Sequence, residues 1–245
     1  MHMNLIIDVG NSFVKTAVFQ GDDLLEKEII EKPELEKKIK KIFQEYPEID
    51  QKIISSVSGA SFSIPETLYE KGDLLELNSS TRLPFENLYA TPNTLGNDRK
   101  ALVAAASKYF KNYNVLVIDA GTCLTYDFKN DQNQYLGGAI SPGLNMRFRA
   151  LNSFTANLPL LSPQEEGELI GSSTSGSMNA GVVLGICREI EGTVLEYSTH
   201  HKDLKIIFTG GDAHFLSKRL KNGIFANSNF LLEGLNYILE FNNNQ

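Results

Sequence analysis

Short apolar runs alternate along the chain with segments whose apolar residues have helical spacing. The first run, residues 4–9, is almost wholly apolar, which is typical of a strand covered on both faces. Asn11 and Ser12 follow as turn residues and a second apolar run begins at Val14, so the opening predicts a β-hairpin. Residues 23–30 extend the pattern to a third strand.

Helical spacing first appears after Pro33. The apolar residues Leu35, Ile39 and Ile42 fall on one face and a run of lysines on the other, which predicts an amphipathic helix with a solvated basic face. A buried strand at 52–57 and a helix at 99–110, rich in strong helix formers, follow.

The opening pattern returns at residues 114–128. An apolar run again ends in an aspartate, Asp119, followed by a glycine, Gly121, and a second strand. After this hairpin the pattern predicts a strand that ends at a glycine turn, 209–211, and helices at 144–157, 176–199, 212–220 and 229–241. We therefore expect two domains of similar organisation, 1–113 and 114–245, joined by a tight crossover.

Length, charge and cysteine content narrow the class of protein. With 245 residues, of which 42% are hydrophobic, the chain suits one large or two small folded domains. The formal net charge is −7 and the basic residues are scattered, so we expect no nucleic-acid partner. Cys123 and Cys187 lack metal or disulfide spacing, which fits a cytoplasmic protein. No apolar run reaches the roughly 18 residues of a membrane span, and we expect no membrane partner.

Asp8, Gly10 and Lys15 can together form a phosphate site. A glycine turn lets backbone N–H groups approach an oxyanion, a carboxylate can hold a cation beside phosphates, and a lysine can act as a point charge on a terminal phosphate. In a single copy, the same residues are explained better as an ordinary hairpin turn. The second copy at residue 119 favours a cleft for a nucleoside triphosphate.

A second candidate site lies at residues 89–101. Gly96 permits a turn, and Asn97 or Asp98 can cap the following helix, so a capping role explains Asp98 equally well. An enzyme that moved a phosphoryl group from a triphosphate to an alcohol would also need a proton acceptor within hydrogen-bond reach of the hydroxyl, and a carboxylate suits that role. Asp98 is the candidate.

Five motifs in order resemble those of the type III pantothenate kinases, members of the superfamily of acetate and sugar kinases, Hsc70 and actin. They are DVGNSFVK (8–15), LGNDR (95–99), DAGTCLTYD (119–127), GGAISPGL (137–144) and TGGDA (209–213). The resemblance implies an α/β fold of two similar ribonuclease H-like (actin-like ATPase) domains, each a mixed five-stranded sheet flanked by helices. It also implies ATP-dependent phosphorylation of pantothenate to 4'-phosphopantothenate, the first step of coenzyme A biosynthesis.

The same resemblance implies roles for single residues. Asp98 is the implied proton acceptor, Asp119 the ligand of a monovalent cation (K⁺ or NH₄⁺), and Asp8 lies near Mg²⁺, through water. The implied nucleotide contacts are Asp8, Val9, Gly10, Asn11, Ser12, Phe13, Val14, Lys15 and Thr122, and the implied pantothenate contacts are Tyr89, Gly96, Asn97, Asp98, Arg99 and Thr174. A homodimer is also implied, with the long helix of the second domain at its interface.

Three other functions share parts of this pattern. A sugar or acetate kinase would have the triphosphate motifs, but Tyr89 and residues 96–99 argue against it. A non-enzymatic role in transcription, assigned to relatives of the family, would not need Asp98 as a base. An actin-like filament protein would need a longer chain.

Overall fold

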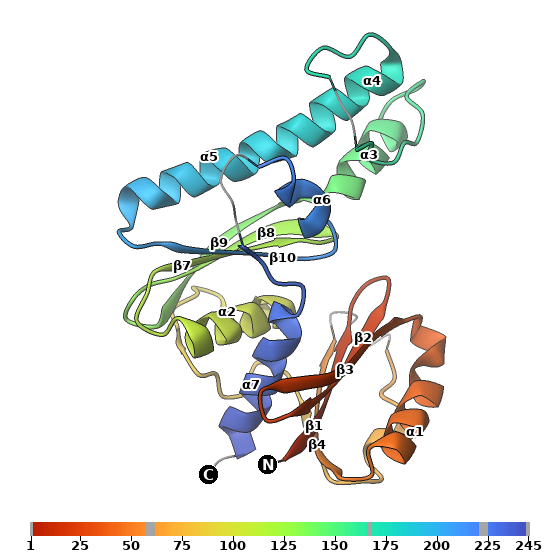
Figure 1. Cartoon of the computed structure of the whole chain (residues 1–245), viewed down its shortest axis with the longest axis vertical. Coiled ribbons are helices and arrows are strands. Elements are labelled where there is room, and N and C mark those ends of the chain that lie inside the picture. The colour runs from red at the N-terminus through yellow and green to blue at the C-terminus, as the bar shows by residue number, and fades with distance from the viewer. Residues whose placement is uncertain (1, 57–61, 166–167, 221–224, 244–245) are drawn as a thin grey trace. The chain divides into compact units, whose positions relative to one another are not determined.

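The chain forms two compact units. The computed structural model describes residues 2–56, 62–165, 168–220 and 225–243 (Figure 1). The first unit contains the chain up to Tyr109 and again from Asn229, and the second unit contains Phe110–Ser228.

The first unit is built on a mixed sheet of five strands, with the order β3-β2-β1-β4-β5. Neighbours β1 with β2 and β2 with β3 run antiparallel, whereas β4 runs parallel to both β1 and β5. The strands are β1 (Met3–Val9), β2 (Val14–Gln20), β3 (Asp23–Ile30), β4 (Ile49–Ser56) and β5 (Asp73–Glu76).

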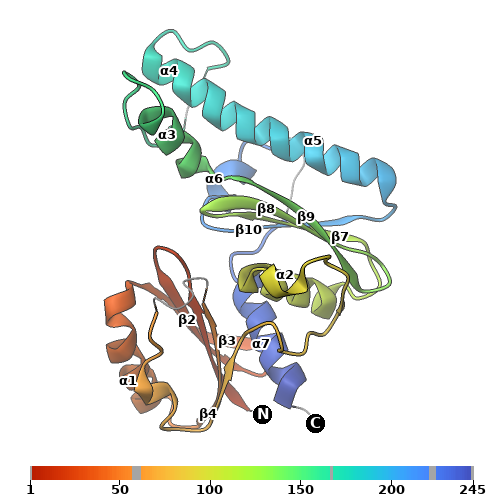
Figure 2. The same ribbon diagram turned by 180° about the vertical axis from the view of Figure 1, so that it is seen from behind.

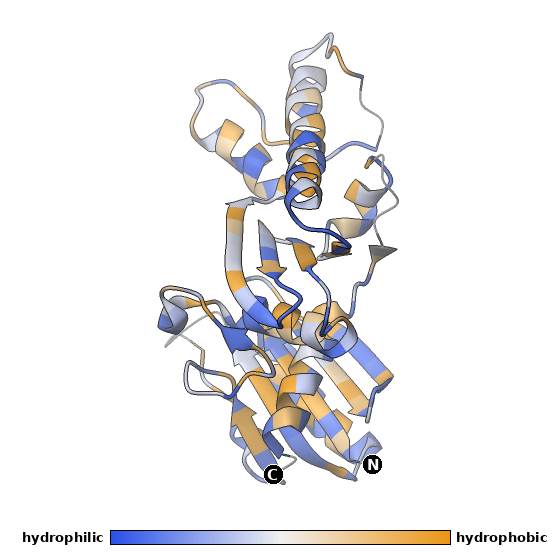
Figure 3. Ribbon diagram, turned by 90° about the vertical axis from the view of Figure 1, so that its left-hand side faces the viewer, coloured by the Kyte–Doolittle hydropathy of each residue, from blue (hydrophilic) through white to orange (hydrophobic). Residues whose placement is uncertain are grey.

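Helices cover both faces of this sheet (Figure 2). On one face lies α1 (Leu35–Glu45), which follows a 3-10 turn at Lys32–Glu34, and its apolar side packs on Leu5, Ile7 and Val9. On the other face lie α2 (Asn97–Tyr109) and α7 (Phe230–Asn243). Figure 3 shows apolar stretches along the strands of this unit. Short elements complete the unit: Glu66–Leu68, β6 (Glu86–Asn87) and Pro92–Thr94.

The second unit repeats the strand arrangement of the first. Its strands follow the order β11-β10-β7-β8-β9. β8 runs antiparallel to both β7 and β9, whereas β10 runs parallel to both β7 and β11. They are β7 (Val115–Ala120), β8 (Cys123–Lys129), β9 (Gln134–Pro142), β10 (Lys205–Thr209) and β11 (Phe225–Ala226). The predicted fold class, two similar α/β domains with mixed sheets, is confirmed.

A long helical stretch covers one face of the second sheet. It consists of α4 (Thr174–Asn179), a π-helical segment (Ala180–Leu184) and α5 (Gly185–His200) in direct succession. Together they account for the helix predicted at 176–199. The shorter helices α3 (Leu144–Ser153) and α6 (Ala213–Ser217) also contribute to the core. In the described part of the chain, no helix has the length and apolar character to cross a membrane.

The last helix packs with the first unit. α7 falls within the predicted second domain, 114–245, whereas in the structure it contacts α2, β1 and β4 of the first unit. A Cβ at Gly234 would lie 1.8 Å from the carbonyl oxygen of Ala101, so a glycine is needed for this close approach of α7 to α2. Periodicity reveals that a helix has an apolar face, but not which sheet covers that face.

Candidate active site

The β1–β2 hairpin presents the predicted nucleotide-binding residues. The N–H of Gly10 donates to the carbonyl oxygen of Phe13 (3.0 Å) and closes the turn. Residues 11–13 are exposed at its tip, whereas the side chains of Val9 and Val14 are fully buried in the core. The tip can therefore offer backbone and polar groups to a ligand, while the two valines anchor it.

Asp8 lies at the end of β1 with an exposed fraction of only 5%. It stands opposite Lys15 in the antiparallel pair and opposite Ser55 in the parallel pair. Burial raises the pKa of Asp8, Lys15 lowers it, Asp98 raises it further, and the hydroxyl of Ser55 lowers it. The site thus contains a buried carboxylate flanked by a cation, a hydroxyl and a second carboxylate.

Asp98 occupies the first turn of α2, which begins at Asn97. Its Oδ1 accepts the N–H of Arg99 (2.8 Å). A Cβ at Gly96 would lie 2.4 Å from the same oxygen, so the glycine leaves room for the carboxylate. A negative charge also suits the first turn of a helix. The electrostatic interaction of Asp98 with Asp8 brings two predicted functional residues into one site.

The predicted pantothenate contacts of the first unit surround this turn. The guanidinium carbon of Arg99 lies 5.5 Å from the ring centroid of Tyr89, which places a buried cation beside a half-buried aromatic ring. The side-chain amide of Asn97 donates to the carbonyl oxygen of Leu77 (2.8 Å) and is anchored to the chain that follows β5.

The β7–β8 hairpin holds Asp119 in a different environment. The N–H of Gly121 donates to the carbonyl oxygen of Cys123 (2.9 Å), and Asp119 is half-buried at the end of β7. Gly210, with φ +100°, follows β10 and lies close to the carboxylate of Asp119, because a Cβ there would lie 2.4 Å from Asp119 Oδ1. Thr122 is exposed at the tip of the hairpin. Two glycine turns therefore border the carboxylate.

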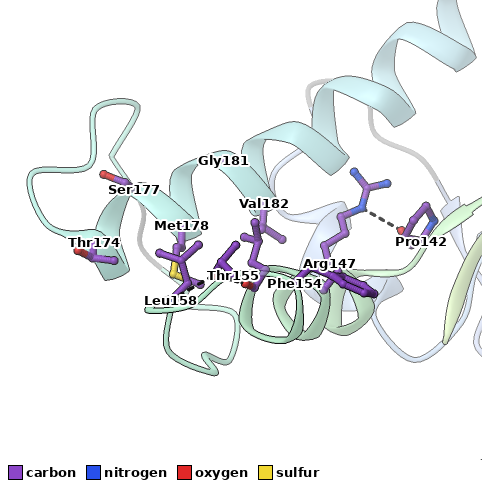
Figure 4. A pocket seen from close by; sticks show the side chains of 12 residues that line it. Pro142, Arg147, Phe154, Thr155, Leu158, Thr174, Ser177, Met178, Gly181 and Val182 are labelled. Carbon is purple, nitrogen blue, oxygen red and sulfur yellow. Dashed lines mark hydrogen bonds between the residues drawn. The ribbon is translucent and has the colours of Figure 1, made fainter.

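Thr174 lies in the lining of a cavity of about 920 Å³ in the second unit. Figure 4 shows the cavity between α3 and the start of the long helical stretch, with Thr174 and Ser177 at one end and Arg147 at the other. Most of the remaining lining is apolar: Ala150, Leu151, Phe154, Leu158, Met178 and Val182.

Arg147, which follows the turn at 142–143, has a structural role. In the structure its guanidinium pairs with Glu189 and donates to the carbonyl oxygen of Pro142 (2.9 Å). Tyr126 also donates to Glu189 (3.3 Å). Glu189 therefore compensates the charge of Arg147, and the cluster ties α3 to α5.

The donor set fits a metal ion that shares its ligands with a nucleotide. Among the described residues, no group of three or more histidine, cysteine, aspartate and glutamate side chains is placed to hold a metal. Mg²⁺ bound with phosphates usually takes one or two carboxylates and several waters rather than an all-protein cage. Asp8 and its neighbours match that requirement.

Comparisons with known proteins identify the family. The family model of type III pantothenate kinase matches residues 4–196. A type III pantothenate kinase of Christiangramia forsetii is 53% identical over 243 residues, which cover 99% of this chain and 100% of that protein. Another, of Flavobacterium johnsoniae, is 46% identical over 239 residues, with 98% of both chains covered.

Solved structures show the same fold at low identity. A conserved putative Baf family transcriptional activator from Campylobacter jejuni has a TM-score of 0.65 and 20% identity, covering 98% of this chain and 100% of that one. A glucokinase from an Antarctic psychrotroph has a TM-score of 0.51 and 11% identity, with 98% and 99% covered. The family match and the full-length relatives agree, and the chain belongs to the type III pantothenate kinase family.

Proposed function

We propose how the residues of this chain carry out the reaction that its family performs. The chain is a kinase that uses ATP to phosphorylate pantothenate in coenzyme A biosynthesis. One observation carries the mechanism: Asp8 and Asp98 interact electrostatically within one unit, and Lys15 stands opposite Asp8. A proton acceptor and a phosphate-binding group are thus close to each other.

Asp98 accepts the proton of the attacking hydroxyl. Its carboxylate is partly accessible and is oriented by the N–H of Arg99. In phosphoryl transfer, positioning of the attacking oxygen and electrostatic stabilisation supply most of the rate.

Lys15 and the tip of the first hairpin hold the phosphates. The glycine turn leaves backbone N–H groups accessible at residues 11–13, and Lys15 adds a positive charge beside them. Asp8 would hold Mg²⁺, through a water molecule. When bound, the ion neutralises and polarises the β- and γ-phosphate oxygens. Lys15 helps keep Asp8 in the charged form that this role requires.

In this proposal, pantothenate lies against Tyr89 and residues 96–99. Thr174, in the lining of the cavity of the second unit, stays a predicted contact. Arg99 supplies a guanidinium that suits the carboxylate of pantothenate. We also propose a homodimer through the long helical stretch. Exposed apolar side chains on the second unit support it: Phe154, Leu160 and Leu195 have exposed fractions of 88%, 62% and 66%.

Asp119 is the proposed ligand of a monovalent cation, K⁺ or NH₄⁺. Its half-buried carboxylate between two glycine turns supports this assignment. When bound, such an ion offsets phosphate charge. Replacing Asp119 by asparagine should abolish activation by potassium and leave the rate in sodium buffer little changed. A normal potassium response in this variant would place the cation elsewhere.

The decisive experiment measures ADP release with pantothenate, glucose and acetate as separate acceptors, in potassium and in sodium buffer. Release with pantothenate alone, enhanced by potassium, is expected. Release of ADP with another acceptor would overturn the assignment of pantothenate as the substrate. Silence with all three, together with measurable ATP binding by calorimetry, would contradict the proposed function.

A further inference from the structure

We infer that Asn97 and Lys100 form a clamp that positions Asp98 for catalysis. Neither residue accepts the proton, and the role rests on the proposed function of Asp98. We call the two side chains and their three carbonyl partners, Ser56, Leu77 and Asn78, the α2 clamp.

Lys100 is the inner half of the α2 clamp. Its exposed fraction is 4%, and its Nζ donates to the side-chain oxygen of Asn97 and to the carbonyl oxygen of Asn78, both at 3.1 Å. Burial alone lowers the pKa of Lys100, and no carboxylate offsets that effect. An ammonium group is costly to bury unless its hydrogen bonds are satisfied. Here those hydrogen bonds connect two backbone segments instead of forming an ion pair.

Asn97 is the outer half and completes the connection. It accepts from Lys100, and its amide donates to the carbonyl oxygens of Leu77 (2.8 Å) and Ser56 (3.5 Å). The N–H of Leu77 in turn donates to the carbonyl oxygen of Ile54 on β4 (2.9 Å). The first turn of α2 is therefore fastened to the end of β4.

The end of β4 is also where Asp8 is supported. Ser55, between the two residues that the clamp reaches on β4, stands opposite Asp8. The segment after β5 is braced as well, because Asn78 accepts from the N–H of Ser80 (2.8 Å) and its own N–H donates to Thr81 (3.0 Å). The α2 clamp thus fixes Asp98 relative to Asp8. A displacement of about 1 Å in a reacting group can lower a rate about 100-fold.

Replacing Lys100 by methionine tests the inference. The substitution keeps length and apolar volume but leaves the oxygens of Asn97 and Asn78 without their donor. We expect kcat with pantothenate to fall roughly tenfold to 100-fold, with KM for ATP within about twofold of wild type. The matched control is Lys108→Met, because Lys108 lies at the other end of the same helix and pairs with Asp22. The control should keep the wild-type kcat.

Two measurements separate positioning from loss of structure. Stoichiometry of ATP binding by calorimetry reports the folded fraction, and kcat is expressed per folded molecule. A double variant with Asn97→Ala should be little worse than the worse single variant, because both changes break one connection. Asn97→Ala, at a half-buried position, also serves if Lys100→Met does not fold. A kcat within twofold of wild type for the folded variants, or fully additive effects, would overturn the inference.

Amide hydrogen exchange tests the clamp without any substrate. The N–H groups of residues 97–100 should exchange at least tenfold faster in Lys100→Met than in wild type, while Lys108→Met leaves them unchanged. Equal exchange in wild type and Lys100→Met would refute the α2 clamp. If the wild-type chain did not phosphorylate pantothenate, the proposed function would fail, and the exchange experiment would still decide the clamp.

Discussion

The two hairpins share a backbone plan and differ in what surrounds their aspartates. In both, an aspartate is the second-last residue of the first strand, and the glycine two residues after it donates its N–H across the turn, over 3.0 Å from Gly10 and over 2.9 Å from Gly121. Asp8 is buried next to a lysine and a second carboxylate, whereas Asp119 is half-buried against Gly210. A duplicated backbone therefore fixes where the carboxylate stands, and the neighbouring elements decide its chemistry.

Register explains much of the difference. The cross-strand neighbour of Asp8 is Lys15, whereas the neighbour of Asp119 is Thr125. The first turn is also longer and has three exposed residues at its tip, 11–13, whereas the tip of the second turn exposes only Thr122. This difference supports the proposed assignment of the phosphates to the first hairpin and of a small cation to the second.

Asp98→Asn should have the largest effect, because the second carboxylate is what distinguishes the first hairpin chemically. Loss of a general base lowers turnover by about 10²–10⁴-fold, and ATP binding, measured by calorimetry, should persist. Asp131→Asn, at an exposed turn of the second unit, is the control. Near-normal turnover in Asp98→Asn would remove Asp98 from the mechanism.

Gly210→Ala and Gly10→Ala should separate the two glycine turns. A Cβ at Gly210 meets two oxygens at 2.4 Å in a backbone of positive φ, whereas at Gly10 the nearest atom is the oxygen of Phe13 at 3.2 Å. We expect Gly210→Ala to lower the free energy of unfolding by about 2–3 kcal/mol and Gly10→Ala by about 1 kcal/mol or less. Urea unfolding measures both. Equal losses would mean that the two turns tolerate side chains alike.

Lys15→Met should raise KM for ATP about tenfold, because a charge-assisted contact to phosphate contributes roughly 1.5–3 kcal/mol. Thr125→Val removes the residue in the equivalent position of the second hairpin and should change KM by less than about twofold. Steady-state kinetics with varied ATP compares them. A similar KM change in both variants would contradict the assignment of the phosphates to the first hairpin.

Asp8→Asn should stabilise the folded chain at neutral pH. Burial raises the pKa of Asp8, so the native state binds this proton more tightly than the unfolded state, and the charged form costs stability above the raised pKa. We expect the free energy of unfolding to rise by on the order of 1 kcal/mol at pH 7. This increase should become smaller as the pH falls through the raised pKa of Asp8. Urea titrations between pH 7 and pH 4 measure it, and a gain independent of pH would exclude charge burial as the cause.

Much of the fold follows from local patterns in the sequence. The hairpins, the strand at 23–30 and the helix after Pro33 form where the apolar spacing predicts them. Long-range packing was not predictable in the same way. Nothing in the spacing of residues 229–241 indicates that β1 and β4 lie beneath them, because an amphipathic pattern does not specify which sheet its apolar face packs against.

In the candidate site, too, the residues of local motifs were predictable, whereas those that depend on long-range packing were not. Sequence motifs led to Asp8, Lys15 and Asp98, which the structure brings together in one unit. Ser55 and Lys100 were not predicted, although both lie next to these residues. Ser55 reaches Asp8 only because β4 runs parallel to β1, and Lys100 appears in the sequence as one more lysine on a helix.

The place of α7 has a consequence for how the chain matures on the ribosome. Residues 230–243 complete the face of a sheet whose first strand begins at Met3, and all of Phe110–Ser228 is synthesised in between. During translation, the apolar surface of β1 and β4 that α7 covers stays uncovered until the whole intervening segment has been synthesised. The first unit is therefore the first to begin synthesis and the last to be completed. A nascent chain stalled before residue 230 would expose that surface to chaperones and proteases.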